Sequence, residues 1–252
     1  MKFSWKKGVA VVSALSMTGG GIALAQIMPP PPALPAPAPV LPPPPPLNDY
    51  KTPIESRDRL GKINDLLAYA PTIERDFKGL KKILQLPNGV LFIDADLDTD
   101  ADGSPRALEI DPQYGQLETS LSFANEEGQR QYVDAEKVPY IVLPLEFYKE
   151  MGIKKGDVAA VIWKGRVIYA LFADTGPKDL IGEGSVALSE ALGFDPWEEK
   201  DGQMQIVSGI ESDVLMFVFP NSADDDITPE NVNLKTIERA KALFQELGGK
   251  VD

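Results

Sequence analysis

A proline-rich stretch divides this chain of 252 residues into two unequal parts. It reads PPPPALPAPAPVLPPPPP from Pro29 to Pro46, and proline lacks the backbone N–H that helices and sheet ladders need. The composition therefore predicts an extended, semi-rigid spacer, which we assign to residues 26–49. A docking site for proline-binding modules is the alternative interpretation. The folded domain is then expected in residues 50–252.

The segment before the spacer has the pattern of an export leader. Three lysines precede a short apolar run that ends in Ala23-Leu24-Ala25, the small-x-small pattern of a signal peptidase site. An uncleaved membrane anchor is the alternative, but polar residues and glycines interrupt the apolar run. We expect residues 1–25 to be a signal peptide, and the product to be secreted or periplasmic, with no membrane insertion after signal cleavage.

Composition excludes several kinds of chemistry. The chain has no cysteine and no histidine, so it cannot form disulfides or use a Ser-His-Asp or Cys-His mechanism. Its formal net charge of −13 disfavours nucleic acid and anionic membranes as partners and favours a cationic one. We expect a monomer that is stabilised by packing.

Periodicity predicts helices near both ends of the domain and strands in its middle. Helices are predicted at residues 54–70, 73–84, 145–152, 185–192 and 229–247. Strands are predicted at residues 89–97, 106–110, 117–123, 140–144, 204–210 and 213–220, with a hairpin at 156–176 that turns at Lys164-Gly165. This order indicates an α+β fold around a mostly antiparallel β-barrel or sheet.

One acidic segment fits the calcium-loop pattern D-x-D-x-D-G-x5-E. Asp98, Asp100 and Asp102 occupy the odd positions, Gly103 allows the sharp turn, and Glu109 is the twelfth residue. These oxygens would be the ligands of a structural calcium ion. The flanking residues have strand character, however, whereas an EF-hand loop lies between helices.

Two other interpretations of this segment therefore stay open. It is a solvated acidic turn, or its first carboxylates, Asp94 and Asp96, stand at a strand end and face a substrate groove.

Two further carboxylates lie in turn-rich surroundings. Asp174 ends the predicted strand RVIYALFADTG, and Glu183 stands between two glycines just before the predicted helix at 185–192. The glycines would let a large ligand approach closely, so both carboxylates could border one cleft. Alternatively, Asp174 caps a turn and Glu183 interacts with the helix dipole.

Three motifs carry a resemblance to a known family. The runs FIDADLDTDADG, VPYIVLP and YALFADTGPKDLIGEGSVALSEALG resemble glycoside hydrolase family 75, the fungal-type chitosanases, over about residues 88–193. By that resemblance, Asp174 and Glu183 correspond to the catalytic pair. It implies an inverting endo-chitosanase that cleaves β-1,4 bonds between glucosamine units of chitosan or a related glucosamine-containing polysaccharide. One departure is Ala101, which stands where family members often have cysteine.

The residues themselves suggest how the roles divide. A glycosidase needs one protonated and one ionised carboxyl group and no metal or cofactor. The Gly-rich, partly apolar setting of Glu183 favours it as the acid, which leaves Asp174, beside the hydroxyl of Thr175, as the base. Asp94 and Asp96 are expected to bind substrate ammonium groups. Thr175 and Ser185 are assigned to substrate binding as well, and Ser185 is also expected to cap the helix that follows.

The order of the predicted elements also resembles double-psi β-barrels of the expansin and endoglucanase type, which implies a six-stranded barrel with helices packed outside. A second function stays open at this level. The chain could be a non-catalytic envelope carbohydrate-binding module, stabilised by calcium, whose carboxylates bind sugar without cleaving it.

Overall fold

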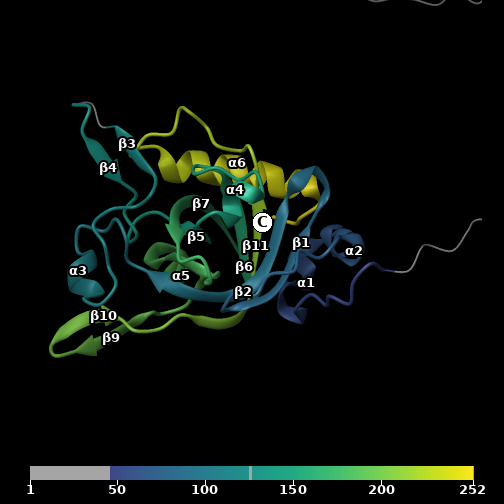
Figure 1. The fold of residues 1–252 in the computed structure, drawn as a ribbon, viewed down its shortest axis with the longest axis horizontal. Helices are drawn as coiled ribbons and strands as arrows, with labels where there is room; N and C mark the ends of the chain where they lie inside the picture. Colours follow the sequence, from purple (N-terminus) through teal and green to yellow (C-terminus); the bar gives the residue numbers. More distant parts are fainter. Residues whose placement is uncertain (1–45, 125–126, 252) are drawn as a thin grey trace, which may run out of the picture. The chain divides into compact units, whose positions relative to one another are not determined.

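The computed structural model describes residues 46–124 and 127–251 (Figure 1). The predicted signal peptide and nearly all of the predicted spacer lie outside these residues. The helices are α1 (Ile54–Leu60), α2 (Ile63–Tyr69), α3 (Ala107–Ile110), α4 (Phe147–Glu150), α5 (Val186–Leu192) and α6 (Val232–Leu247), with a short 3₁₀ turn at Pro87–Gly89. The strands are β1 (Leu80–Gln85), β2 (Leu91–Asp100), β3 (Ser122–Ala124), β4 (Arg130–Tyr132), β5 (Tyr140–Pro144), β6 (Val158–Trp163), β7 (Arg166–Gly176), β8 (Glu183–Ser185), β9 (Trp197–Lys200), β10 (Gln203–Ile206) and β11 (Ile210–Phe219).

Six strands close a barrel in the order β2-β11-β6-β7-β5-β8 and back to β2. The β5–β7 and β2–β8 pairings are parallel, and the others are antiparallel. Strand β1 pairs with the first half of β2, and β8 pairs with its second half. The predicted α+β fold, a mostly antiparallel barrel with helices outside it, is confirmed.

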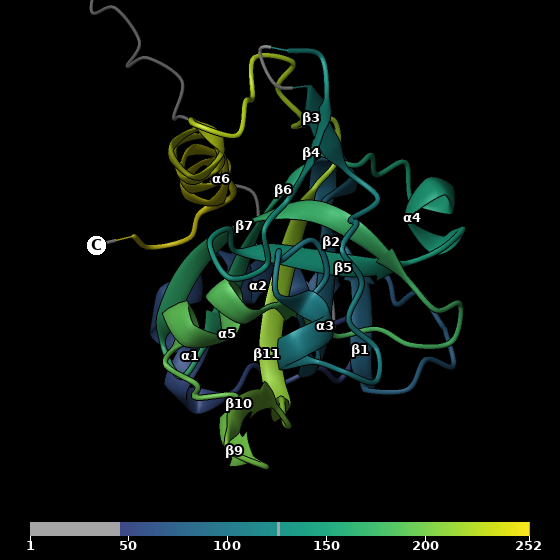
Figure 2. The ribbon, with the colours of Figure 1, turned by 90° about the vertical axis from the view of Figure 1, so that its left-hand side faces the viewer.

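Alternate residues of the barrel strands pack into two apolar clusters, as the period of two requires. On β6, Ala160 and Ile162 pack in the cluster that also holds side chains of α1, α2 and α6, such as Phe244. Ala159 and Val161 of the same strand pack in the cluster that holds side chains of α4 and α5. Figure 2 shows α6 alongside the barrel. Both faces of the strands are therefore buried over much of their length, and the chemistry must lie where the strands end.

Two predicted elements are wrong. Residues 73–84 were expected to be helical, but they form a loop and then β1, because pairing with β2 stabilises the extended form. Residues 106–110 were expected to be a strand, but they form the short helix α3, whose Ala107 and Ile110 are buried one helical turn apart. In both cases contacts with distant residues override the local pattern.

Other elements agree with the sequence in kind and differ in their limits. The helix predicted at 54–70 is broken at Gly61, where φ is 52°. The strand predicted at 117–123 is shorter and lies later, at Ser122–Ala124. The helix predicted at 229–247 starts at Val232, after a turn at Asn231. The folded unit starts slightly before Tyr50, since Leu47 N donates to Ala68 O. No helix within the described ranges has both the length and the hydrophobicity to span a membrane.

Candidate active site

A cleft of about 770 Å³ opens at one end of the barrel. Its walls come from the end of β2, the loop after α3, the β7–β8 connection, and the hairpin formed by β9 and β10 with the residues that follow it. The α3 segment lies close to this hairpin, and both are at the left of Figure 1. The charged side chains that line it are acidic except for Lys200, and the acidic ones are Asp98, Asp100, Asp102, Asp111, Asp174 and Glu183.

Four of the lining residues form one row across four strands. Asp98 on β2 pairs in register with Glu183 on β8, and Glu183 pairs with Val142 on β5. Val142 in turn pairs with Asp174 on β7. Because neighbouring strands lie about 4.8 Å apart, the Cα atoms of Asp174 and Glu183 are roughly 9–10 Å apart. The barrel thus places the two predicted catalytic residues on either side of one valine, with both facing the cleft.

A β-bulge determines how Asp174 is presented. Ile141 pairs with Phe172, whereas the next residue, Val142, pairs with Asp174, so that Ala173 is left over. An extra residue in one strand bends it and redirects the side chains that follow, and such bulges are common beside active sites. The bulge turns Asp174 into the cleft at the point where β7 ends.

The environment of Glu183 favours its protonated form. Burial and the negative charges of Asp100, Asp98 and Asp174 raise the pKa of Glu183 to about 7. Its carboxyl group also lies over Gly176, because a Cβ added there would overlap Glu183 Oε2. A carboxyl group with a pKa near neutrality can hold a proton and deliver it to a substrate.

Asp174 is buried and is held in place by backbone donors. Its side chain is 7% exposed, and Oδ1 accepts hydrogen bonds from Ser120 N at 2.8 Å and Thr175 N at 2.7 Å. The Thr175 side chain, predicted to bind substrate, lines the cleft, and its hydroxyl bonds with Ser120 Oγ at 2.6 Å.

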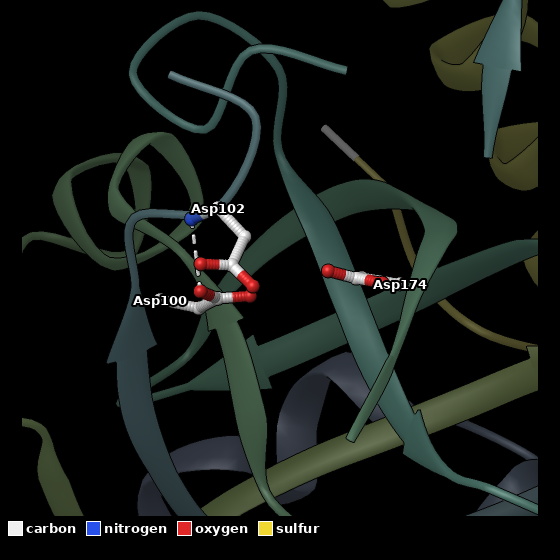
Figure 3. Close-up of side chains that lie close together, drawn as sticks. All are labelled: Asp100, Asp102 and Asp174. Carbon is white, nitrogen blue, oxygen red and sulfur yellow. Dashed lines mark hydrogen bonds between the residues drawn. The ribbon is translucent and has the colours of Figure 1, made fainter. Parts of the chain in front are cut away.

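Asp100 and Asp102 stand beside Asp174 (Figure 3). One carboxylate oxygen from each of the three lies within 4.8 Å of the others. Burial is the largest cause that raises the pKa of Asp100 to about 6 and that of Asp102 to about 8, and the Coulomb repulsion between the neighbours adds to it. Asp102 N donates to Asp100 Oδ1 at 2.9 Å, and the buried Tyr140 hydroxyl donates to Asp100 Oδ2 at 3.0 Å. These contacts hold the cluster in place.

The acidic segment does not form the loop that its spacing suggested. Asp98 and Asp100 belong to the extended strand β2, and Asp100 and Asp102 meet Asp174 rather than Glu109. Glu109 lies on α3 and forms an ion pair with Arg106 at 3.5 Å. The oxygens that could hold a divalent cation in the described residues are therefore those of Asp100, Asp102 and Asp174, which belong to the cleft.

Three other predicted binding residues lie away from the cleft lining. Asp94 is fully buried and accepts from Tyr50 Oη at 2.9 Å, and Asp96 packs its carboxyl group against Gly182. Ser185 is also fully buried, and its Oγ caps α5 by accepting from Leu188 N at 3.1 Å. The predicted capping role of Ser185 is confirmed, and the structure brings none of the three side chains to the cleft surface.

Several residues that hold the cleft carboxylates in place could not be found from local sequence patterns. Tyr140, Ser120 and Gln116 are brought to the site by long-range contacts, and Gln116 N donates to Asp102 Oδ1 at 2.7 Å. The only local signal was Tyr140 in VPYIVLP, whose neighbours indicated a strand.

A sequence model of the family described as the fungal chitosanase of glycosyl hydrolase group 75 matches residues 97–251. The chain belongs to this family. The predicted resemblance is confirmed, and the group-75 match extends past the three motifs to the end of α6. A group-75 chitosanase is a glycoside hydrolase, so the matched region, which contains Asp174 and Glu183, carries that activity. A search of curated proteins gave no match.

Proposed function

We propose that this chitosanase is an endo-acting enzyme that cleaves β-1,4 bonds between glucosamine units with inversion at the anomeric carbon. The observation that carries the proposal is the placement of Asp174 and Glu183 on either side of Val142, both facing one cleft. Inverting glycosidases keep their two carboxyl groups about 6.5–9.5 Å apart to leave room for a water molecule. Carboxyl groups carried two strands apart are compatible with that range.

Glu183 is the general acid. Its pKa of about 7 leaves it largely protonated in mildly acidic solution, so it can give its proton to the glycosidic oxygen as the bond from this oxygen to C1 breaks. Asp174 is the general base, and its ionised carboxylate takes a proton from water that attacks C1 from the opposite face. The product is an α-hemiacetal. Exchange with solvent then returns a proton to Glu183 and removes one from Asp174.

The charge of the cleft supports a cationic substrate. Asp98 and Asp111 line it together with the Asp100–Asp102 pair, and Lys200 is the one cationic side chain in the lining. Asp98 is exposed and lies next to Glu183 in the row. Glucosamine units carry ammonium groups that can form charge-assisted hydrogen bonds with such carboxylates. We assign recognition of these groups to Asp98 and Asp111, in place of Asp94 and Asp96.

The remaining parts of the account concern the rest of the chain. We propose that the signal peptide is cleaved after Ala25 and that the enzyme is exported. Residues 26–45 then act as an extended spacer before the folded domain. The enzyme works as a monomer. Two carboxyl groups suffice for the reaction, so no cofactor is required.

The experiment is a reducing-end assay of residues 46–252 on chitosan, fully acetylated chitin and carboxymethyl cellulose. The account predicts new ends from chitosan and a rapid fall in its viscosity, which marks internal cleavage. Chitin has acetylated amines in place of ammonium groups, so it tests whether the substrate needs them. Carboxymethyl cellulose is anionic, so it tests whether the substrate must carry positive charge. Equal cleavage of the anionic polymer, or binding of chitosan without new ends, would overturn the proposal.

A further inference from the structure

One aromatic side chain lies at the rim of the cleft with most of its surface in solvent. Tyr114 lines the cleft and is 72% exposed. Single exposed apolar residues are common on protein surfaces, so exposure alone has no functional meaning. The functional argument rests on the hydrogen bonds that fix the backbone of the loop carrying this tyrosine.

The loop that carries Tyr114 is tied down on both sides. Asp111 Oδ1 accepts from Gln113 N at 3.3 Å and from Tyr114 N at 3.1 Å, and Gly115 N donates to Asp111 O at 3.0 Å. Gly115 also approaches Ala107 O so closely that a Cβ would overlap it. The backbone on which the ring stands is therefore fixed, while the ring itself is not buried.

The same loop is bonded to the carboxylate cluster. Gln116 N and Nε2 donate to the two carboxylate oxygens of Asp102 at 2.7 and 3.0 Å, and Gln116 O accepts from Gly103 N at 2.9 Å. Asp102 is one of the three carboxylates that meet at Asp174. Gln116 is two residues after Tyr114, so its hydrogen bonds to Asp102 and Gly103 fix the position of Tyr114 relative to the reacting groups.

We propose that Tyr114 is a sugar-stacking platform for a glucosamine unit next to the pair whose bond is cleaved. This rests on the proposed function of the same cleft. The apolar C–H face of a pyranose ring can pack on the aromatic face, and an ammonium group within about 6 Å of the ring is attracted by its electron-rich face. A rigid aromatic with only two side-chain torsions offers this surface at a small entropy cost.

The test compares Tyr114→Ala with Tyr114→Trp and with Leu108→Ala. Leu108 lies on the neighbouring helix α3, is 59% exposed and does not line the cleft, so it controls for loss of exposed apolar surface. The platform predicts that Tyr114→Ala raises the KM for chitosan about tenfold and changes kcat less than about twofold, because binding is lost equally in ground and transition states. Tyr114→Trp keeps the wild-type KM, and so does Leu108→Ala.

A binding measurement separates this inference from the proposed function. Calorimetry with a glucosamine hexamer, on Glu183→Gln and on Glu183→Gln with Tyr114→Ala, reports affinity without turnover. A tenfold weaker affinity of the double variant supports the platform, even if the wild type should fail to cleave chitosan. Equal affinities, or a KM for Tyr114→Ala equal to that of Leu108→Ala, would overturn it. Circular dichroism of Tyr114→Trp and Tyr114→Ala checks that both variants retain the fold.

Discussion

Asp174 and Glu183 are paired in register with the same residue, Val142, one from each side of strand β5. Their separation is therefore set by two strand spacings of the barrel rather than by loops that can move. A site on strands holds its groups more precisely than one on loops, which suits a mechanism in which a water molecule must fit between acid and base.

The first prediction concerns the two carboxyl groups. Glu183→Gln and Asp174→Asn keep the shape of each side chain but remove proton transfer, so each should lower kcat on chitosan about 10²–10⁴-fold. The wild-type kcat should fall as the pH rises through about 7, because Glu183 then loses the proton it must donate. Initial rates between pH 4 and pH 9 check both points. Full activity of either folded variant would remove that residue from the pair.

A glycine controls the position of the acid. Alanine at position 176 would carry a Cβ that overlaps Glu183 Oε2, and the glutamate can move away because it is flexible. We expect Gly176→Ala to lower kcat at least about tenfold, the effect of a misplaced catalytic group, with little change in melting temperature. In the Glu183→Gln background the same substitution should have little further effect. Additive losses in a double-mutant cycle would show that Gly176 acts through other contacts.

Stability should depend on pH through the buried carboxyl groups. The pKa values of Asp100, Glu183 and Asp102 are raised to about 6, 7 and 8, mainly by burial, from the ordinary values of 3.8 for aspartate and 4.5 for glutamate. A raised carboxyl pKa means that the folded state binds the proton more tightly. The protonated carboxyl groups therefore contribute fully to stability below about pH 4, and this contribution is lost as the pH rises through their folded-state pKa values. The melting temperature should therefore fall between pH 5 and pH 8.5.

Asp102→Asn should reduce this fall and stabilise the protein at pH 8.5, because it removes the negative charge from the cluster. Asp179→Asn is the matched control. Lys78 lowers the pKa of Asp179, so that group titrates below the range measured. Differential scanning calorimetry at both pH values gives the comparison. An unchanged slope in Asp102→Asn would contradict the assigned protonation.

The boundary of the folded unit gives another prediction. Asn48 Nδ2 donates to Leu67 O and Ala70 O, each at 2.8 Å, and Asn48 Oδ1 accepts from Tyr50 N at 2.8 Å. Deleting residues 26–45 should leave the melting temperature and the chitosan turnover unchanged, as expected of a spacer. Asn48→Ala should destabilise by about 1–3 kcal/mol through the lost hydrogen bonds. A lower melting temperature after the deletion would show that the spacer packs on the domain.

The sequence predicted the strands and the central hairpin because their signals are local, whereas the six-stranded barrel was implied by the resemblance to double-psi β-barrels. Alternation along 156–176 and the Lys164-Gly165 turn, where φ is 46° and 76°, specify the hairpin without reference to the rest of the chain. Asp174 and Glu183 could be singled out for the same reason, since turn residues and glycines surround both. Local patterns do not determine which strands pair with one another.

The errors therefore lie where distant residues decide the outcome. Phe77, Leu80 and Leu84 have helical spacing, yet Leu80 and Leu84 belong to β1 because β2 is available as a partner. The spacing of Asp98, Asp100 and Asp102 resembled a calcium loop, yet β2 continues through the first two and Asp174 approaches from β7. The bulge at Ala173 and the Tyr140 hydroxyl at Asp100 likewise depend on the closed barrel.

The anomeric configuration of the first product is the measurement that tests the central claim most directly. Wild-type enzyme is mixed with a glucosamine hexamer in deuterated buffer near pH 5.5, and proton NMR spectra are collected before mutarotation equilibrates the anomers. A water molecule held between Asp174 and Glu183 attacks once, so the α-anomer should accumulate first and then convert to the equilibrium mixture. An initial excess of the β-anomer would require a covalent intermediate and would contradict the account.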